Sequence, residues 1–337
     1  MIGIFPDLPL PPPGRSGWPW TTADQPDLSG RLRVTVVTPS FNQAEYLEAT
    51  IRSVLLQSHR QIEFLLIDGG STDGSRELIA RYAAHMDYWV SEPDRGQAHA
   101  INKGFERATG EILGWINSDD YYTPGAVARI VAEFEADPSL EWIYGDCFMR
   151  TEPGGNLSLR PSEPFVFPAA LRGHSPIWQP SAFFRRSLLD ATGGLDETFR
   201  LAMDYDLWLR AIKHTSPLYL SGPPLAVITD HAQTKSRRQL GEVVFESTRA
   251  VECFYAGRTV PGDALHARRR VMGHLYFECA AAAVLWRKSV WQGARWFLRA
   301  AAQDPRVLFR IPVLSVQLAA LLVARQIELS ASRQRTR

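Results

Sequence analysis

Apolar positions along the first two thirds of the chain follow the pattern of an α/β protein. Residues 34–38 form a β-branched run, and residues 64–68 and 111–116 form two further apolar runs, which predicts buried strands. Between them, apolar side chains recur at helical spacing, first at Leu47, Ile51, Val54 and Leu55. Near-continuous apolar strands that alternate with helices predict a mostly parallel sheet covered on both faces.

The pattern changes at both ends of the chain. Residues 1–30 contain seven prolines, which predicts an extended N-terminal tail. Beyond about residue 235 strand signals stop, and residues 236–337 predict a helical region. Its last apolar segment, 311–324, is shorter than the roughly 20 residues that span a bilayer. We expect this segment to dock on the body of the protein, with peripheral membrane contact as the alternative.

Composition excludes several classes of protein. With 45% hydrophobic and 22% charged residues, the chain is neither disordered nor fibrous nor embedded in a membrane. Its 37 basic and 36 acidic residues give no general attraction to nucleic acid. Three cysteines without CxxC spacing indicate neither a disulfide framework nor a zinc site, and the N-terminus lacks the basic start of a secretory signal. These features predict a cytoplasmic protein.

Polar motifs follow the predicted strands, at the edge of a parallel sheet where ligands bind. Asn117-Ser-Asp-Asp120 follows the strand at 111–116. Its adjacent carboxylates repel each other, and oxygen ligands of this kind suit Mg²⁺ or Mn²⁺ with positions left for substrate phosphates. An isolated Asp-Asp pair would more simply cap a turn. The metal hypothesis therefore depends on the motifs around it.

Five motifs occur in order along the chain: Thr38-Pro-Ser-Phe-Asn-Gln, Leu66-Ile-Asp-Gly-Gly-Ser-Thr-Asp-Gly74, Ser91-Glu-Pro-Asp-Arg-Gly96, Asn102-Lys-Gly104 and Asn117-Ser-Asp-Asp120. Together they closely resemble family 2 glycosyltransferases of the GT-A fold. The resemblance covers roughly residues 33–235 and implies a Rossmann-like catalytic domain at 31–235. It also implies inverting transfer of a sugar from a nucleotide diphosphate, usually UDP. Acceptors of such enzymes are often glycans or lipid-linked sugars, which implies a role in cell-envelope polysaccharide synthesis. The resemblance is compatible with a cytoplasmic enzyme that works at the inner face of the cell membrane.

The resemblance assigns residues to the donor side of the site. Thr38 and Pro39 match the end of the first strand, which lies along the nucleotide base. Glu45 matches an acidic residue near the base or ribose. Asp68 matches the first Asp of the family's Asp-Asp-Gly-Ser motif, whereas Gly69 stands where the second Asp often contacts uracil.

The same resemblance implies the metal and diphosphate ligands. Asp120 is expected to hold Mn²⁺ or Mg²⁺, and Asp119 to contact the ribose or the metal. His231 falls where many relatives place a metal or diphosphate histidine, and a neutral imidazole is an acceptable ligand for Mn²⁺. Arg95 and Lys103 border the donor pocket and could contact the diphosphate. Each could equally be a solvated surface charge.

Asp204 resembles the family's general base, with Met203 in place of the usual Glu. The acceptor hydroxyl attacks opposite the leaving diphosphate and loses its proton as the new bond forms, so a carboxylate is needed on that face. Asp206 is the rival candidate for the general base. Its alternative role is that of an acid favoured by a helix N-terminus. Trp178 and Gln179 resemble the acceptor side, where Trp178 stacks on a sugar or serves as a core tryptophan.

Two other functions compete with sugar transfer. A Rossmann-type NAD(P) oxidoreductase or a nucleotidyltransferase would need a phosphate fingerprint such as Gly-x-Gly-x-x-Gly after the first strand, where Thr38-Pro-Ser-Phe-Asn-Gln stands instead. A non-catalytic glycan-binding relative is open to any fold. The presence of Asp119, Asp120 and Asp204 together argues against the second alternative.

Overall fold

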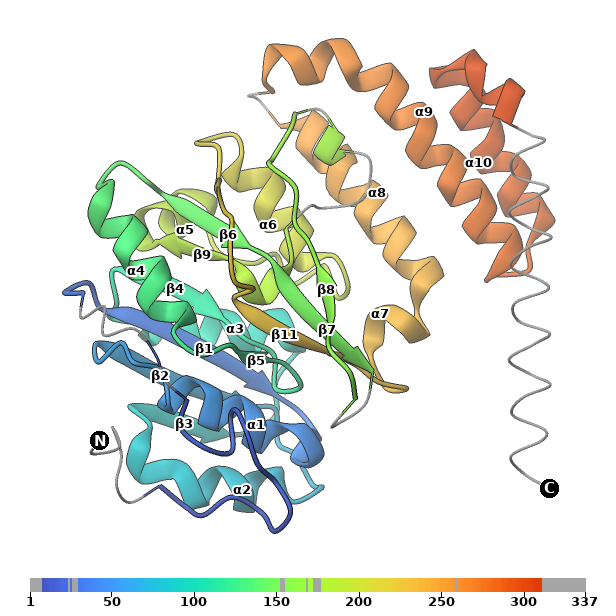
Figure 1. The fold of residues 1–337 in the computed structure, drawn as a ribbon. Helices are drawn as coiled ribbons and strands as arrows, with labels where there is room; N and C mark the ends of the chain where they lie inside the picture. The colour runs from blue at the N-terminus through green and yellow to red at the C-terminus, as the bar shows by residue number, and fades with distance from the viewer. Residues whose placement is uncertain are drawn as a thin grey trace, which may run out of the picture. The chain divides into compact units, whose positions relative to one another are not determined.

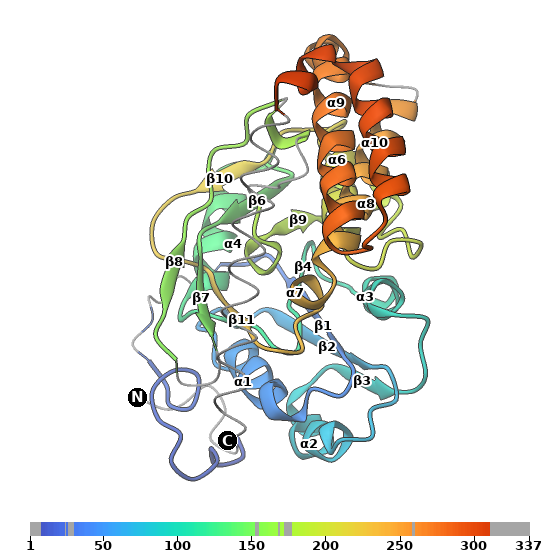
Figure 2. The ribbon, with the colours of Figure 1, turned by 90° about the vertical axis from the view of Figure 1, so that its right-hand side faces the viewer.

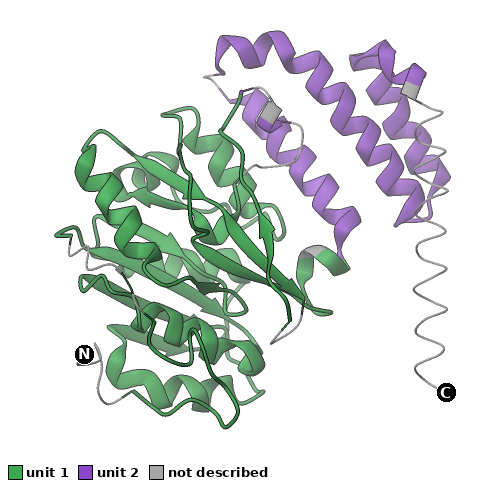
Figure 3. Cartoon of the chain, viewed as in Figure 1, with its two compact units in different colours: residues 1–166, 175–238 green, residues 167–174, 239–337 purple. Residues whose placement is uncertain are grey.

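The computed structural model describes residues 8–23, 25, 30–151, 155–167, 169–171, 177–257 and 260–310. The chain divides into two compact units (Figure 3). The first comprises residues 1–166 and 175–238, and the second comprises residues 167–174 and 239–337. The predicted segment 311–324 lies outside the described residues. Both sheets belong to the first unit, and the described secondary structure of the second unit is helical.

A seven-stranded sheet forms the centre of the first unit, in the order β10-β6-β9-β4-β1-β2-β3 (Figure 1). β9 runs antiparallel to both of its neighbours, and the other neighbouring pairs are parallel. The predicted mostly parallel sheet is thus confirmed. Its strands are β1 (Val34–Ser40), β2 (Ile62–Asp68), β3 (Tyr88–Ser91), β4 (Ile112–Trp115), β6 (Trp142–Gly145), β9 (Phe183–Arg185) and β10 (Leu218–Leu220).

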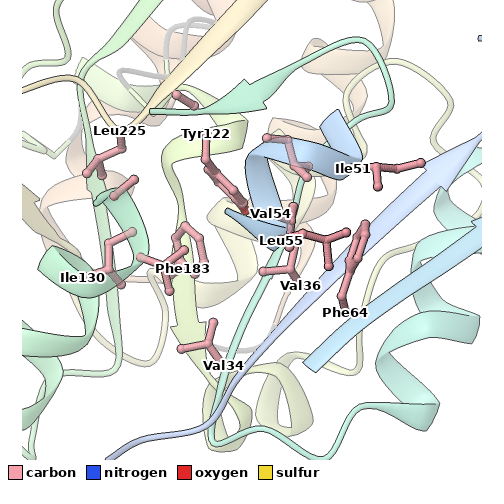
Figure 4. Close-up of a cluster of buried hydrophobic side chains, with 14 of the residues drawn as sticks. Val34, Val36, Ile51, Val54, Leu55, Phe64, Tyr122, Ile130, Phe183 and Leu225 are labelled. Atoms are coloured by element: carbon pink, nitrogen blue, oxygen red, sulfur yellow. The ribbon is translucent and has the colours of Figure 1, made fainter. Parts of the chain in front are cut away.

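Helices cover both faces of this sheet because its central strands are apolar on both sides. Val34, Val36 and Phe64 face a core that includes side chains of α1 and α4 (Figure 4). On the opposite face, Gly104 of α3 lies directly against Val37. The helices of this unit are α1 (Ala44–Leu55), α2 (Ser75–Tyr82), η1 (Ala83–His85), α3 (Gln97–Arg107), α4 (Ala126–Ala136), η3 (Gln179–Ser181), α5 (Arg186–Thr192), α6 (Met203–Ala211) and α7 (Lys235–Arg238).

A second, four-stranded sheet continues from the loop after β4. Its order is β5-β11-β7-β8, with β5 antiparallel to β11 through Tyr121 opposite Val227. β5 begins directly after Asp120, and β11 ends directly before His231. The pairing therefore brings together two segments more than 100 residues apart in sequence. The strands are β5 (Tyr121–Tyr122), β7 (Cys147–Thr151), β8 (Ser158–Arg160) and β11 (Ala226–Asp230).

The described part of the proline-rich N-terminal segment packs on the first unit through one arginine. Arg52 of α1 is buried, and its guanidinium donates hydrogen bonds to the carbonyl oxygens of Pro9, Pro19 and Trp20 at 2.7–3.1 Å. The indole N–H of Trp18 donates to the carbonyl oxygen of Tyr122 at 2.6 Å. The expected tail thus makes specific contacts, which proline content alone did not predict.

The second unit is a helical array, as predicted for the chain beyond residue 235. α9 packs against α10, and Figure 2 shows the two helices side by side. Close approach requires small residues, since a side chain at Gly293 of α10 would collide with Val284 of α9. No described helix is long and apolar enough to cross a membrane. The described helices are η2 (Ala169–Leu171), α8 (Leu240–Ala256), α9 (Gly262–Leu285), α10 (Val290–Gln303) and η4 (Pro305–Arg310).

We predict that Arg52→Met lowers the free energy of unfolding by about 2–3 kcal/mol, because buried carbonyl oxygens lose a charged donor. It should also speed proteolysis within residues 8–23. Urea unfolding and limited proteolysis measure the two effects. Arg76→Met, at an exposed position of α2, is the matched control and should change stability by less than about 0.5 kcal/mol. Equal effects of the two substitutions would show that Arg52 does not hold the N-terminal segment.

Candidate active site

The sequence motifs follow the carboxyl ends of neighbouring strands. Ser40, at the end of β1, is in register with Asp68 at the end of β2, and Asp68 is in register with Ser91 at the end of β3. β4 lies on the other side of β1, with Trp115 opposite Val37. The loops that follow these four strands therefore leave the same edge of the sheet, where ligands bind in α/β proteins.

The first two of these loops are fastened to each other. The Ala44 N–H, at the start of α1, donates to Asp73 Oδ2 at 2.9 Å, so a carboxylate from the neighbouring loop caps this helix. The side-chain oxygen of Asn42 accepts from the Thr72 N–H at 2.9 Å, and Ser71 Oγ accepts from the Asn42 N–H at 2.7 Å. Two motifs that are separate in sequence thus form one rigid rim.

Asp68 organises its own loop. It is fully buried, and its Oδ2 accepts hydrogen bonds from the Gly70 N–H, the Ser71 N–H and the Ser91 hydroxyl at 2.6–3.1 Å. Its Oδ1 accepts from the Ser71 hydroxyl at 2.5 Å. These bonds give Asp68 a structural role at the edge of the site. Its predicted contact with the donor stays a prediction.

Gly69 is a site of close packing. A Cβ atom added here would lie 2.6 Å from Asp94 Oδ2 and 3.3 Å from the ring of Phe41. Asp94 Oδ1 accepts a hydrogen bond from the Gly96 N–H at 2.7 Å, which fixes the carboxylate in that position. In this chain the carboxylate of Asp94 occupies the space beside Gly69, so the departure from the Asp-Asp-Gly-Ser pattern is accommodated by the next loop.

The motif Asn102-Lys-Gly104 has a structural explanation at each position. The Asn102 amide exchanges two hydrogen bonds with the backbone of Leu195, at 2.9 and 3.0 Å. Lys103 forms an ion pair with Glu92. A side chain at Gly104 would lie 2.4 Å from Val37 Cγ1, so glycine lets α3 approach β1. The predicted contact of Lys103 with a diphosphate would require release of Glu92.

Arg95 is also paired. Its guanidinium donates to both carboxylate oxygens of Glu197 at 3.0 and 3.1 Å, in the segment between α5 and α6. The pair is largely exposed, so its contribution to stability is small. The pair links the loop after β3 to the segment before α6. Contact of Arg95 with a diphosphate stays a prediction.

Asp120 is a buried carboxylate beside a second carboxylate. It is 5% exposed, and Oδ1 accepts from the Thr229 N–H of β11 at 3.0 Å. Burial raises the pKa of Asp120 well above its usual range, and the neighbouring charge of Asp119 raises it further. Such a group favours a proton or a cation beside it. The Thr50 hydroxyl donates to the Asp120 carbonyl oxygen at 2.6 Å and fixes the loop from α1.

His231 lies against Asp119. Its Nε2 is 3.1 Å from Asp119 Oδ2, and the imidazole ring stacks on Tyr46 of α1 with ring centroids 4.4 Å apart. His231 is buried, and its Nδ1 accepts from the Gln233 N–H at 3.3 Å, so three contacts fix the orientation of its ring. The predicted neighbours in the metal site are therefore in contact, although their bond to a metal stays a prediction.

A chain of amide side chains joins the loops after β3 and β4 to the segment before β9. Gln97 donates to Asn117 Oδ1 at 2.7 Å, and the Asn117 amide donates to Gln179 Oε1 at 3.1 Å. The Gln179 amide in turn donates to the Trp115 carbonyl oxygen at 2.8 Å. Gln179, predicted on the acceptor side, therefore lies beside the loop that carries Asp119 and Asp120.

Lys235 closes this network from the start of α7. Its ammonium donates to Gln97 Oε1 at 2.9 Å. Desolvation by the surrounding protein lowers the pKa of Lys235, while the nearby carboxylates of Asp119 and Asp94 oppose the shift. Lys235 thus supplies a positive charge within reach of two acidic loops.

The side chains that could ligate a metal here suit a divalent cation that keeps most of its coordination positions for other ligands. Among the described residues, no three His, Cys, Asp or Glu side chains lie close enough to enclose an ion by themselves. Asp119 and His231 are in contact, and the desolvated carboxylate of Asp120 follows directly in sequence. One or two carboxylates completed by substrate phosphates and water is the usual arrangement for Mg²⁺. The residues present fit this arrangement.

The two candidate bases differ in their partners. Asp206 is buried and forms an ion pair of 2.7 Å with Arg210, whose guanidinium also donates to the carbonyl oxygens of Thr192 and Gly194. Asp206 therefore fastens α6 to the end of α5. Asp204, in the first turn of α6, is half-buried and accepts from the Tyr205 N–H at 2.8 Å. Desolvation raises the pKa of Asp204 above its usual value.

Aromatic stacking places α6 at the same end of the sheet. Trp208, one helical turn after Asp204 and on the same side of α6, stacks on Trp115 with centroids 5.6 Å apart. Trp115 is the last residue of β4, four positions before Asp119. α6 is thus tied, through Trp208, to the strand that carries the acidic loop.

The remaining predicted residues occupy different environments. Thr38 is fully buried in β1 with its neighbour Pro39, so its side chain does not line a surface. Glu45 is exposed in the first turn of α1, next to Tyr46. Trp178 is half-buried against the core, and its indole N–H lies 3.4 Å from the Pro161 carbonyl oxygen. Contacts of these residues with substrates stay predictions.

Sequence reasoning did not place Gln97, Asn117 or Lys235 among the candidate site residues. A signal for Gln97 was available, because it directly follows Asp94-Arg-Gly96 at the start of a helix that faces the ligand edge. Asn117 belongs to the same motif as the candidate residues Asp119 and Asp120. Lys235 had a signal in its position, because it opens the basic run after His231 that could close over phosphates or simply be exposed. Its place in the network depends on the pairing of β11 with β5 and β7.

The sequence model of Glycosyl transferase family 2 matches residues 35–193. An uncharacterized glycosyltransferase of Mycobacterium tuberculosis is 33% identical over 187 residues, which cover 55% of this chain and 71% of that protein. The putative teichuronic acid biosynthesis glycosyltransferase TuaG of Bacillus subtilis is 41% identical over 129 residues, which cover 37% of this chain and 50% of that protein.

Solved structures share the fold. The mannosyltransferase PcManGT from Pyrobaculum calidifontis, in complex with GDP-Man and Mn²⁺, matches with a TM-score of 0.56, 21% identity and 89% of each chain covered. S. aureus TarS 1–349, in complex with UDP-GlcNAc, matches with a TM-score of 0.53, 14% identity, and 82% of this chain and 91% of that chain covered. These likenesses confirm the GT-A fold that the motifs predicted.

We predict that Gly69→Ala lowers the free energy of unfolding by about 1 kcal/mol, because the new methyl group displaces Asp94 from its hydrogen bond with the Gly96 N–H. In an Asp94→Ala background the methyl group has room, and the same substitution should be neutral or slightly stabilising. A double-mutant cycle by urea unfolding measures the coupling. Additive effects would show that Asp94 does not constrain residue 69.

Proposed function

Because this chain belongs to glycosyl transferase family 2 and is a glycosyltransferase, we propose that it moves a sugar from a nucleotide-diphosphate sugar to an acceptor hydroxyl with inversion. One observation carries the proposal. The adjacent carboxylates of Asp119, which is partly buried, and Asp120, which is buried, follow the carboxyl end of β4, and His231 contacts Asp119. A site that concentrates negative charge in this way suits a substrate that arrives with a cation.

The donor is a nucleotide-diphosphate sugar, with UDP as the favoured nucleotide. Its base and ribose lie along the ends of β1 and β2, near Pro39, Glu45 and Asp68. TarS in complex with UDP-GlcNAc supports a uridine donor, and PcManGT in complex with GDP-Man supports nucleotide sugars in general. Lys235, which donates to Gln97 in the network, and Arg95, in the loop after β3, bind the diphosphate.

Asp120 and Asp119, with His231 beside Asp119, would hold Mn²⁺ or Mg²⁺, with the diphosphate completing the set of ligands. The Mn²⁺ in the PcManGT complex supports this choice. When bound, the cation neutralises charge that develops on the leaving diphosphate. Asn117 and the Thr229 N–H orient the carboxylate of Asp120, while Tyr46 orients His231. These groups are in place before the substrate arrives, so little reorganisation is needed in the transition state.

Asp204 is the general base. Its raised pKa gives the carboxylate a higher affinity for the acceptor proton than an exposed aspartate has, which suits proton removal near neutral pH. The acceptor hydroxyl donates this proton to Asp204 while the acceptor oxygen attacks the anomeric carbon of the sugar. The bond between that carbon and the diphosphate breaks, and the nucleotide diphosphate leaves. Asp206 is held by Arg210 and has no part in the proton transfer. Trp178 and Gln179 line the acceptor side.

The acceptor is a glycan or a lipid-linked sugar of the cell envelope. TuaG, named for teichuronic acid biosynthesis, supports this acceptor class. The enzyme works in the cytoplasm, at the inner face of the cell membrane where lipid-linked acceptors can reach it.

We predict that Asp204→Asn lowers the transfer rate by at least about a hundredfold, because the amide cannot take the acceptor proton. Far-UV circular dichroism and the melting temperature should be unchanged or slightly improved, since a desolvated charge is removed. The measurement is release of free nucleotide diphosphate from each of a panel of nucleotide sugars with Mn²⁺ present and candidate acceptors added.

Asp206→Asn is the matched control, because Asp206 lies two residues after Asp204 in the first turn of α6. It should lower the melting temperature, because Arg210 loses its carboxylate partner, and it should keep transfer activity below the melting transition. The opposite assignment, with Asp206→Asn folded but inactive and Asp204→Asn active, would remove Asp204 from the mechanism.

A further inference from the structure

The outer side of α10 carries large apolar side chains that none of the described residues covers. Val290 is 71% exposed, Trp291 is 87% exposed and Leu298 is 69% exposed. Trp291 and Leu298 are seven positions apart, so they lie on one side of the helix, whereas Val290, its first residue, lies outside that side. η4, which follows α10 directly, adds Phe309 at 84% exposure.

The inner side of α10 already has its partner. Trp296 lies 5.5 Å from Tyr276 of α9 between ring centroids, and Phe297 lies 6.3 Å from Phe277. Ala300 is fully buried in this contact. The helix therefore has two apolar sides, of which one forms the core with α9 and the other is exposed. Exposed apolar side chains grouped in this way mark an interaction surface.

The charge on the same helix is of one sign. α10 contains Arg295 and Arg299 and no acidic residue, and both arginines are exposed. Between positions 260 and 310 the chain has nine basic and three acidic residues. A second copy of this face would be repelled by its own charge, whereas a surface with anionic headgroups would be attracted.

We propose that the outer side of α10 docks on an anionic lipid surface. Trp291 and Leu298 enter the boundary between headgroups and acyl chains, where an indole ring is favoured. Arg295 and Arg299 extend their stems along the apolar layer and place their guanidinium groups at lipid phosphates. The helix lies in the plane of the interface. This inference does not depend on the identity of the donor or on the catalytic residues.

Co-sedimentation of the full chain with vesicles tests the proposal. Binding should be strong to phosphatidylcholine vesicles that contain phosphatidylglycerol, weak to pure phosphatidylcholine, and reduced at high salt. Trp291→Ser should weaken binding about tenfold, through loss of buried apolar area. Arg295→Gln should weaken it about fivefold, through loss of one charge near the surface. Both positions are exposed, so the fold should persist.

Two substitutions in the first unit serve as matched controls. Leu159→Ser removes an exposed leucine of β8, and Arg76→Gln removes an exposed arginine of α2. Neither should change vesicle binding. The proposal is overturned if the α10 variants bind anionic vesicles like the wild type. It is also overturned if the wild type itself does not bind them. Self-association without vesicles that Trp291→Ser abolishes would assign this face to a second copy and also overturn the proposal.

Discussion

The site depends on one electrostatic constraint, the burial of Asp120 next to Asp119. Two carboxylates in neighbouring positions repel each other, and removal of water from Asp120 makes the repulsion stronger. The fold tolerates this arrangement because Thr229 and Asn117 donate hydrogen bonds to Asp120, and His231 lies against Asp119. The remaining excess of negative charge favours a cation and its phosphate ligands.

The rest of the first unit holds that pair in place. The parallel register of β1, β2 and β3 brings three loops to one edge, and the antiparallel pairing of β5 with β11 brings His231 to the acidic loop. Stacking of Trp208 on Trp115 then ties α6 to β4. The proposed base and the proposed metal ligands thus depend on one aromatic core for their relative positions.

Much of the fold and part of the site could be predicted from the sequence. The apolar runs predicted the central strands, because a parallel sheet buries both faces of each strand. The motifs correctly indicated which loops meet, but not what their side chains do. Lys103 and Arg95 have carboxylate partners, Asn102 fastens a distant backbone, and Asp94 fills the space beside Gly69. Such roles depend on contacts across the fold, which spacing along the chain does not encode.

Metal-dependent binding of nucleotide diphosphate tests the central claim most directly. Calorimetric titration of the full chain with UDP and with GDP, in Mn²⁺ or in chelator, compares the wild type with Asp120→Asn. The account predicts that the wild type binds either UDP or GDP tightly when Mn²⁺ is present. It predicts that this binding is lost in chelator and in Asp120→Asn. Equal binding in chelator, or Mn²⁺-dependent binding that survives in Asp120→Asn, would contradict the role of Asp120 and its acidic neighbour.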